Sequence, residues 1–270
     1  MGRTRFLPST RSIPTSRSPY RASSIFHPYL PSSISAALAR PAMSPSPESL
    51  AKINAELRHQ SPLAIVRWAL ARSQGRAVVS TNFRPYEAAI LHLAVSVQPD
   101  IPVLWVDHGY NRPATYRHAE ELRTRLQLNL QPYLPRLTPA HRDALYGPLP
   151  DLTDEAGLKR FSTQMKLEPF QRGMRELAPT VWLTALRQVQ NPNRAGLDIV
   201  TLDANFGALK VSPLFYATDA DLEAYLAQHQ LPNEWDYFDP AKADEKRECG
   251  LHAAWGGQAV AATAEIGDGR

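Results

Sequence analysis

The sequence predicts an α/β protein with an open, doubly wound and mostly parallel sheet and flanking helices. Three observations lead to this fold class. Apolar runs of strand length alternate with helix-like runs of about 10 to 15 residues, as in parallel strand–helix–strand units. Helix-capping residues stand at the start of several longer runs. With 270 residues, of which 43% are hydrophobic, the chain can bury a substantial core.

Two helices are expected at the start of the structured region. Ser46 can cap the first, with Pro47 in the first turn and Glu48 near the positive end of the helix dipole. The run 61–75 repeats the pattern, with Ser61 as the cap and Gly75 as the stop signal.

The alternation of strands and helices follows. Strands are expected at 76–80, 101–107, 128–133, 180–186, 198–203 and 208–214. Helices are expected at 87–97, 113–127 and 218–230, the last with Thr218 as its cap. In open α/β sheets, ligands bind beyond the carboxyl ends of the strands. The loops that follow the first two strands are therefore the first places to look for a site.

The charge is unevenly distributed along the chain. The formal net charge is +4, but six of the 30 basic residues lie in the acid-free stretch 1–47, so 24 basic residues face 26 acidic ones in the remainder. The high isoelectric point thus describes the N-terminal stretch and gives no argument for a nucleic-acid partner. No apolar run approaches the roughly 20 residues of a membrane span, so no membrane partner is expected.

The terminal stretches are expected to lie outside the folded domain. Residues 1–45 are rich in Ser, Arg and Pro, which suits either an organelle transit peptide or translation that truly starts at Met43. The predicted organisation is a disordered extension at 1–45, a domain at 46–252 and a flexible tail at 253–270. The expected location is the cytoplasm, or an organelle stroma or matrix if 1–42 is a transit peptide.

Cys249 is the only cysteine, and it stands in the polar motif "RECGLH". A single cysteine excludes an intramolecular disulfide, a Cys-only zinc site and an iron–sulfur cluster held by cysteines alone. It also favours a reducing compartment. A lone cysteine is most often an inert buried residue, so its polar neighbours raise the alternative that Cys249 is reactive.

The loop after the first strand suits an anion. Ser80, Thr81, Asn82 and Phe83 lead into a helix, where free backbone N–H groups and hydroxyls can form a cradle, and Arg84 can add a charged fork. An ordinary capped turn is the alternative. A Walker loop is excluded because its Gly-Lys-Ser/Thr signature is absent.

Other polar residues also fall at expected element ends. Asp107 ends the second apolar strand and suits a ribose hydroxyl or adenine amine, while Gly109 permits close backbone approach and Tyr110 offers a ring for stacking. The further candidates for the same pocket are Lys166 and Glu168, which pair ahead of a proline, and Arg187, Gln190 and Arg194 after the strand at 180–186. Each alone also fits a local cap, a local ion pair or a solvated face.

Taken together, these motifs resemble a known family. The segments "STNFRPYEAAILHL", "PDIPVLWVDHGYNRPATYRHAEEL", "KLEPFQRGMREL", "WLTALRQVQNPNRAGL", "LKVSPL" and "RECGLH" occur in the order seen in phosphoadenylyl-sulfate (PAPS) reductases. The resemblance covers roughly residues 60–252. It implies the adenine-nucleotide α-hydrolase-like fold and reduction of PAPS to sulfite and adenosine 3′,5′-bisphosphate in sulfate assimilation, with thioredoxin or glutaredoxin as electron donor.

The resemblance also implies roles for residues. Cys249 matches the nucleophile, residues 80–83 match a modified PP-loop that faces the sulfate-bearing phosphate, and Asp107, Gly109 and Tyr110 match the nucleotide-side motif. Lys166, Arg187 and Arg194 match basic positions near the phosphates and sulfate, with Arg247 and His252 as neighbours that stabilise a thiolate. No bound cofactor, metal or iron–sulfur cluster is expected, and family members are commonly homodimers.

The chain departs from the family pattern at several positions. Arg84 and Pro85 follow Phe83 where a glycine is usual, His108 replaces Thr or Ser, Gln188 replaces a second Arg, and the stretch before "ECGLH" is short. Two alternatives therefore stay open: a cluster-free adenylyl-sulfate (APS) reductase, and a nucleotide-binding paralogue without catalysis. A PP-loop synthetase or sulfurylase small subunit is less favoured, because its Ser-Gly-Gly-x-Asp-Ser motif is absent.

Overall fold

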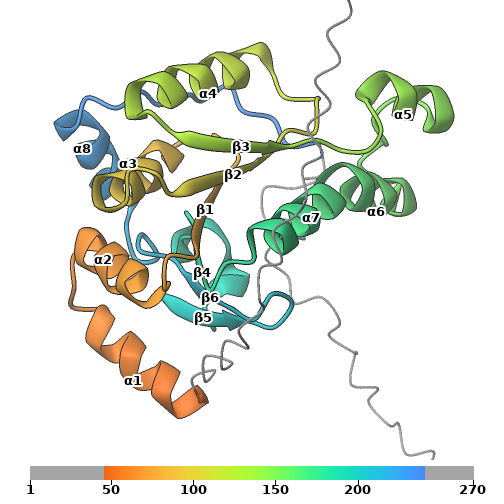
Figure 1. The fold of residues 1–270 in the computed structure, drawn as a ribbon. Coiled ribbons are helices and arrows are strands. Elements are labelled where there is room, and N and C mark those ends of the chain that lie inside the picture. Colours follow the sequence, from red (N-terminus) through yellow and green to blue (C-terminus); the bar gives the residue numbers. More distant parts are fainter. Residues whose placement is uncertain (1–45, 241–270) are drawn as a thin grey trace, which may run out of the picture. The chain divides into compact units, whose positions relative to one another are not determined.

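The computed structural model describes residues 46–240 (Figure 1). Cys249, Arg247, His252 and the predicted terminal segments 1–45 and 253–270 lie outside the described residues. The helices are α1 (Pro47–Leu57), α2 (Pro62–Arg72), α3 (Glu87–Val97), α4 (Pro113–Leu126), α5 (Pro139–Tyr146), α6 (Glu155–Ser162), α7 (Glu168–Leu177) and α8 (Asp219–Gln228). The strands are β1 (Ala77–Thr81), β2 (Pro102–Val106), β3 (Asn129–Tyr133), β4 (Val181–Leu183), β5 (Val200–Asp203) and β6 (Ala208–Val211).

The strands of the described part form one six-stranded sheet in the order β3-β2-β1-β4-β6-β5. All neighbours are parallel except β5, which pairs antiparallel with β6 at one edge. β1 is central, and its Val79 aligns with Val103 of β2 and Leu183 of β4. The prediction of an open, mostly parallel sheet is confirmed.

Helices cover both faces of this sheet. Figure 1 places α2, α3 and α8 on one side and α7 on the other. Along β1, Val79 belongs to the larger core cluster with α3, whereas its neighbour Val78 packs with Phe170 of α7 and Trp182. Successive strand residues point to opposite faces of the sheet, and helices bury both faces. The strand sequences are therefore continuous apolar runs and do not alternate with polar residues.

Two helices approach the sheet through specific contacts. At Gly173 of α7, a Cβ atom would lie 2.9 Å from Leu104 Cδ1 and from ring carbons of Tyr133, so only glycine allows this approach to β2 and β3. Asn54 of α1 is buried, and its side chain donates to Val200 O at 2.9 Å and accepts from Val200 N at 2.8 Å. Asn54 thereby satisfies backbone groups of the edge strand β5 as another strand would.

The capping residues behave as the sequence predicts, whereas one region was missed. Ser46, Ser61 and Thr218 each accept a backbone N–H in the first turn of their helix. The sequence interpretation assigned no helix between 134 and 179, yet α5, α6, a π-helical turn at Thr163–Leu167 and α7 occupy it. The spacing of Phe170 and Met174 carried a signal for α7, while α5 exposes Leu145 and Tyr146 and lacks an apolar stripe.

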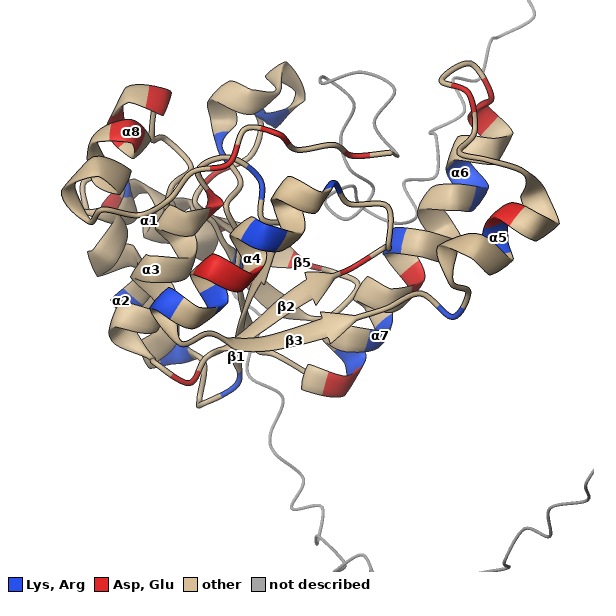
Figure 2. Cartoon of the chain, turned by 90° about the horizontal axis from the view of Figure 1, so that it is seen from above, with Lys and Arg blue, Asp and Glu red and all other residues tan. Residues whose placement is uncertain are grey.

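Figure 2 shows basic and acidic positions interspersed over the helices and loops rather than separated onto two faces. Among the described residues, every helix is too short or too polar to cross a bilayer.

Replacing Asn54 by Ala tests the contact between α1 and β5. We expect Asn54→Ala to lower the free energy of unfolding by about 2 kcal/mol, because two backbone groups of Val200 lose buried partners. The measurement is denaturant unfolding followed by circular dichroism. Asn205→Ala, at an exposed position after β5, is the matched control. Equal stability of the two variants would contradict this role of Asn54.

Candidate functional site

A pocket lies beyond the carboxyl ends of β1, β2 and β4. Its floor is apolar, with Leu104, Val106, Phe170 and Trp182, and its rim is polar. The remaining lining residues are Ser80, Thr81, Asn82, Arg84, Glu87, Ala185, Leu186, Arg194 and Asp239. The carboxyl ends of neighbouring parallel strands meet at one edge, which is why residues far apart in sequence gather here.

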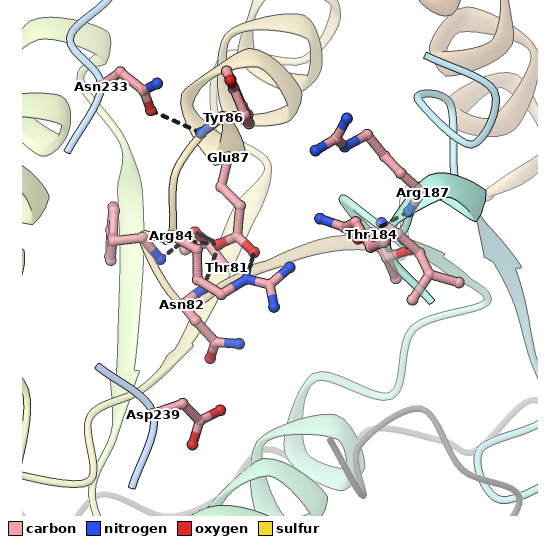
Figure 3. Close-up of polar contacts among 12 residues, drawn as sticks. Thr81, Asn82, Arg84, Tyr86, Glu87, Thr184, Arg187, Asn233 and Asp239 are labelled. Atoms are coloured by element: carbon pink, nitrogen blue, oxygen red, sulfur yellow. Dashed lines mark hydrogen bonds and ion pairs between the residues drawn. The ribbon is translucent and has the colours of Figure 1, made fainter. Parts of the chain in front are cut away.

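The carboxylate of Glu87 organises the turn after β1 (Figure 3). Its Oε2 atom accepts from the Thr81 hydroxyl at 2.9 Å, from Asn82 N at 2.7 Å and from Arg84 N at 3.3 Å. Its Oε1 atom accepts from Arg84 Nε at 3.2 Å. Glu87 is only 7% exposed, and as the first residue of α3 it sits where the helix dipole favours a negative charge.

The other backbone donors of this turn also have partners within the chain. Phe83 N donates to Thr81 Oγ1, Tyr86 N to Asn233 Oδ1 and Glu87 N to Arg84 O. Pro85 has no backbone N–H. The sequence interpretation expected free backbone N–H groups at the start of this helix. In the structure the N–H groups of Asn82, Arg84 and Glu87 already have partners, and a carboxylate of the chain itself lies in the turn.

The side chain of Phe83 packs in the core and does not line the pocket. It is fully buried and packs edge-to-face on Trp105 of β2, with ring centroids 5.1 Å apart. The positive φ angles of Phe83 (55°) and Tyr86 (70°) bracket Arg84. The buried ring anchors the turn and leaves Arg84 at the pocket.

Ser80 is held by the floor of the pocket. Trp182 Nε1 donates to Ser80 Oγ at 2.8 Å, which leaves the Ser80 hydroxyl hydrogen for another acceptor. Lys210 Nζ lies over the indole, 4.9 Å from the ring centroid of Trp182. These contacts fix the orientation of Trp182 between β1 and β6.

Lys166 and Asp239 form a buried ion pair at the pocket. Lys166 Nζ donates to both carboxylate oxygens at 2.7 Å, and the two side chains are 3% and 4% exposed. The sequence interpretation paired Lys166 with Glu168 instead. Glu168 starts the next helix and pairs with Arg136 and Arg172, outside the pocket lining. Lys166 lies in the π-helical turn Thr163–Leu167, whereas Glu168 is the first residue of α7, and the two side chains bond different partners.

The arginines after β4 are buried and interlocked. Arg194 Nη1 donates to Gln190 Oε1 at 2.6 Å and to Arg187 O at 2.9 Å, and Gln190 also accepts from Arg187 N. The Arg187 guanidinium bonds Asp219 at 2.7 Å and lies 5.2 Å from the ring centroid of Tyr86. Arg194 lines the pocket, whereas Arg187 links this loop to α8.

The turn after β2 is built around Asp107. Its Oδ1 atom accepts from Gly109 N, the Asn111 amide and the Tyr116 hydroxyl, at 2.9, 3.1 and 2.8 Å. Burial and then the bond to Asp107 raise the pKa of Tyr116 to about 12, so Tyr116 remains a donor. The pocket lining described above does not include this turn.

Gly109 and Tyr110 contact α5. A Cβ atom on Gly109 would lie 2.5 Å from Pro139 Cγ, and φ is +75° there. The Tyr110 hydroxyl donates to Pro139 O and to Asp143. The close approach expected at Gly109 is therefore to a helix of the same chain, and the polar end of Tyr110 is already used.

His108 is buried beside this turn and stays neutral. Burial, and next the positive charge of Lys166, lower the pKa of His108 to about 4. Its Nδ1 atom accepts from Tyr110 N at 3.1 Å, which requires that nitrogen to be unprotonated.

The irregular segment 231–240 runs along the rim. Asn233 bonds Tyr86 N at 2.8 Å, Asp236 pairs with Arg112 at the start of α4, and Asp239 pairs with Lys166. The segment thereby touches three elements at the carboxyl edge of the sheet. The last described residue, Pro240, stands nine positions before Cys249.

Sequence reasoning missed Glu87, Asp239, Asn233 and Trp182 as site residues. Glu87 carried a weak signal, since an acid in the first helical turn often bonds backbone N–H groups of the preceding residues. The others depend on long-range contacts that no local pattern marks. Within residues 46–240, no group of three His, Cys, Asp or Glu side chains could hold a metal ion.

The sheet order and the pocket beyond β1 place the protein among open α/β proteins, in which ligands bind beyond the carboxyl ends of parallel strands. Residues 76–235 match the family model described as the phosphoadenosine phosphosulfate reductase domain. The chain belongs to this family of oxidoreductases, and the family predicted from the motifs is confirmed.

Curated relatives agree with the family model. A protein of Synechococcus sp. named phosphoadenosine 5′-phosphosulfate reductase is 37% identical over 235 residues, covering 78% of this chain and 99% of its own. A protein of the same name from Synechocystis sp. is 35% identical, covering 75% and 90%. The crystal structure of a PAPS reductase from Candida auris, a phosphate complex, has a TM-score of 0.61 at 24% identity, covering 70% and 89%. That structure supports the fold.

Gly109→Ala tests whether this glycine is needed for packing. We expect a loss of about 2 kcal/mol or more in unfolding free energy, because the new Cβ atom clashes with Pro139 and the positive φ is strained. Gly207→Ala separates these causes, since φ is +64° there but no atom lies within 4 Å. Equal losses in the two variants would show that contact with Pro139 adds nothing.

His108→Asn tests the buried neutral imidazole. Above pH 6.5, His108 is neutral in both states, whereas between pH 6.5 and about 4 only the unfolded chain binds the proton. The wild type should therefore lose up to about 3 kcal/mol more stability than His108→Asn over this interval. Urea unfolding at several pH values measures the difference, and the other histidines cancel because both proteins contain them. Parallel pH profiles would contradict the lowered pKa.

Proposed function

We propose that this chain is a thioredoxin-dependent reductase of 3′-phosphoadenylyl sulfate that acts through an S-sulfocysteine at Cys249. Membership of the reductase family carries the proposal. A pocket with an apolar floor and two arginines, Arg84 and Arg194, on its rim suits a nucleotide that carries phosphate and sulfate. Glutaredoxin is the alternative electron donor, and the expected assembly is a homodimer.

The chain length permits Cys249 to visit the pocket. Asp239 lines the pocket, and Cys249 follows ten positions later. Ten extended residues span at most about 35 Å, which is ample for a thiol that must meet both a nucleotide and a protein reductant.

The proposed chemistry balances in two displacements. The Cys249 thiolate attacks the sulfate sulfur, an S–S bond forms, the S–O bond to the phosphate breaks, and adenosine 3′,5′-bisphosphate leaves with the electron pair. A thioredoxin thiolate then attacks Cys249 Sγ, and sulfite leaves with the electron pair of the S–S bond. The second thioredoxin thiol frees Cys249 and yields a thioredoxin disulfide, so sulfur gains two electrons from two thiols.

The remaining candidates receive supporting roles. Lys166, Arg187 and Arg194 would stabilise the phosphates and the leaving group, and Ser80 offers a hydroxyl donor. Arg247 and His252 would favour the Cys249 thiolate. Asp107 and Tyr110 would act at the nucleotide side of the site.

The test is intact-protein mass spectrometry of the full chain mixed with PAPS in the absence of reductant. We expect an adduct of one SO₃ group that maps to Cys249, disappears in Cys249→Ser and is released as sulfite by thioredoxin. APS is offered in a parallel reaction as the competing substrate.

Each outcome has a definite meaning. An adduct with PAPS alone supports the proposal, and an adduct with APS alone replaces the substrate while keeping the mechanism. Binding of both nucleotides without any adduct would overturn the reductase assignment and favour a paralogue that only binds.

A further inference from the structure

The ion pair between Lys166 and Asp239 places a carboxylate of the chain where the proposed function needs a cation to face the ligand. We propose that Asp239 competes with an anionic group of the nucleotide for Lys166, and that displacement of Asp239 releases segment 231–240 from this side of the pocket. The inference deepens the proposed function and rests on it for the ligand, a phosphate or sulfate group of an adenine nucleotide.

Asp239 binds the ammonium group of Lys166 in the way an oxyanion would. Lys166 Nζ lies 2.7 Å from both carboxylate oxygens, the distance of a charge-assisted hydrogen bond. The side chains of Lys166 and Asp239 are only 3% and 4% exposed. An incoming anion therefore reaches the ammonium group only if Asp239 leaves it.

Asp239 also stands between Lys166 and the pocket. Asp239 is among the residues that line the pocket, whereas Lys166 is not. Figure 3 shows the Asp239 carboxylate below Asn82, and both residues line the pocket. A phosphate group that enters the pocket meets the carboxylate first and is repelled by it. Because a terminal phosphate carries more negative charge and more acceptor oxygens than a carboxylate, it is the stronger partner for the ammonium group.

Segment 231–240 is attached to the domain in a way that permits this exchange. Its residues form neither helix nor strand, so little backbone pairing opposes a local movement. Asp236 pairs with Arg112, but both side chains are about half exposed, and such surface pairs contribute little. Asn233 holds the start of the segment on the turn after β1. Release of Asp239 thus frees the later part of the segment while the earlier part stays anchored.

The exchange would link nucleotide binding to the approach of the thiol. Asp239 precedes Cys249 by ten positions, so its attachment to Lys166 restrains the chain that leads to the nucleophile. An anion that takes the place of Asp239 removes this restraint at the moment when the substrate is in the pocket. Nucleotide binding and the freedom of the Cys249 thiol are thereby coupled.

Isothermal titration of the full chain with inorganic sulfate, and separately with adenosine 3′,5′-bisphosphate, tests the competition. We expect Asp239→Asn to bind both anions about tenfold more tightly, because the competing charge is lost while the side-chain shape is kept. Asp236→Asn is the matched control, since it removes the same charge from the same segment at a half-exposed position. The control should leave both affinities nearly unchanged, because solvent screens that charge.

A double-mutant cycle tests whether the effect of Asp239 acts through Lys166. If it does, Asp239→Asn has no further effect on binding in Lys166→Met. Thermal unfolding of each variant identifies loss of structure, because removing one member of a buried pair leaves an unpaired charge. The double variant contains neither charge, so it serves alone if Lys166→Met does not fold, and it should bind the anions no more tightly than the wild type.

Hydrogen exchange of the wild type gives a readout that needs no variant. On addition of adenosine 3′,5′-bisphosphate, the amides of segment 231–240 should exchange faster, because their attachment through Asp239 is lost. The amides of the buried strand β1 should not exchange faster, which distinguishes local release from general loosening.

Several results would overturn the inference. These are equal or weaker anion binding by folded Asp239→Asn, an equal gain in Asp236→Asn, and unchanged or slower exchange in segment 231–240 with nucleotide. Absence of anion binding by both the wild type and Asp239→Asn would overturn it as well. Failure of the proposed function is distinguishable: the wild type would then form no Cys249 adduct with PAPS or APS, whatever the Asp239 variants do to anion binding.

Discussion

Burial of both faces of the central strands is the constraint on which the rest of this structure depends. Val78 and Val79 of β1 belong to opposite core clusters, so both faces of the strand are occupied by apolar side chains and the polar residues of the site gather at the strand ends. The carboxyl ends of β1, β2 and β4 lie at one edge, and the polar residues that follow them meet there. The pocket therefore has an apolar floor contributed by the strands and a charged rim contributed by the loops.

Internal carboxylates organise the loops at this edge of the sheet. Glu87 closes the turn after β1, Asp107 closes the turn after β2, and Asp239 neutralises the buried Lys166. Each buried charge has a partner, as the cost of desolvation demands. The consequence is a pocket whose cations are held in fixed positions by the chain itself, so that ligand binding needs little further ordering of these side chains.

Contacts between remote segments determine what the individual motifs do. The sequence predicts that Gly109 and Tyr110 contact a ligand. In the structure Gly109 lies against Pro139, and the Tyr110 hydroxyl bonds Pro139 O and Asp143 of α5. The sequence predicts that Glu168 pairs with Lys166. In the structure Glu168 follows the π-helical turn and its carboxylate pairs with Arg136 and Arg172. Segment 231–240 contacts the turn after β1 through Asn233, Arg112 at the start of α4 through Asp236, and Lys166 through Asp239.

The sequence by itself determined the fold class, the strand–helix alternation, the caps at Ser46, Ser61 and Thr218, and the family, because these depend on local spacing and ordered motifs. It also located the turn 80–83 at the pocket. Only the tertiary structure decided that Glu87 fills that turn, that Asp239 rather than Glu168 pairs with Lys166, and that α5 packs on Gly109. The physical reason is that such pairings join residues up to 73 positions apart, and their energies depend on burial that no local pattern encodes.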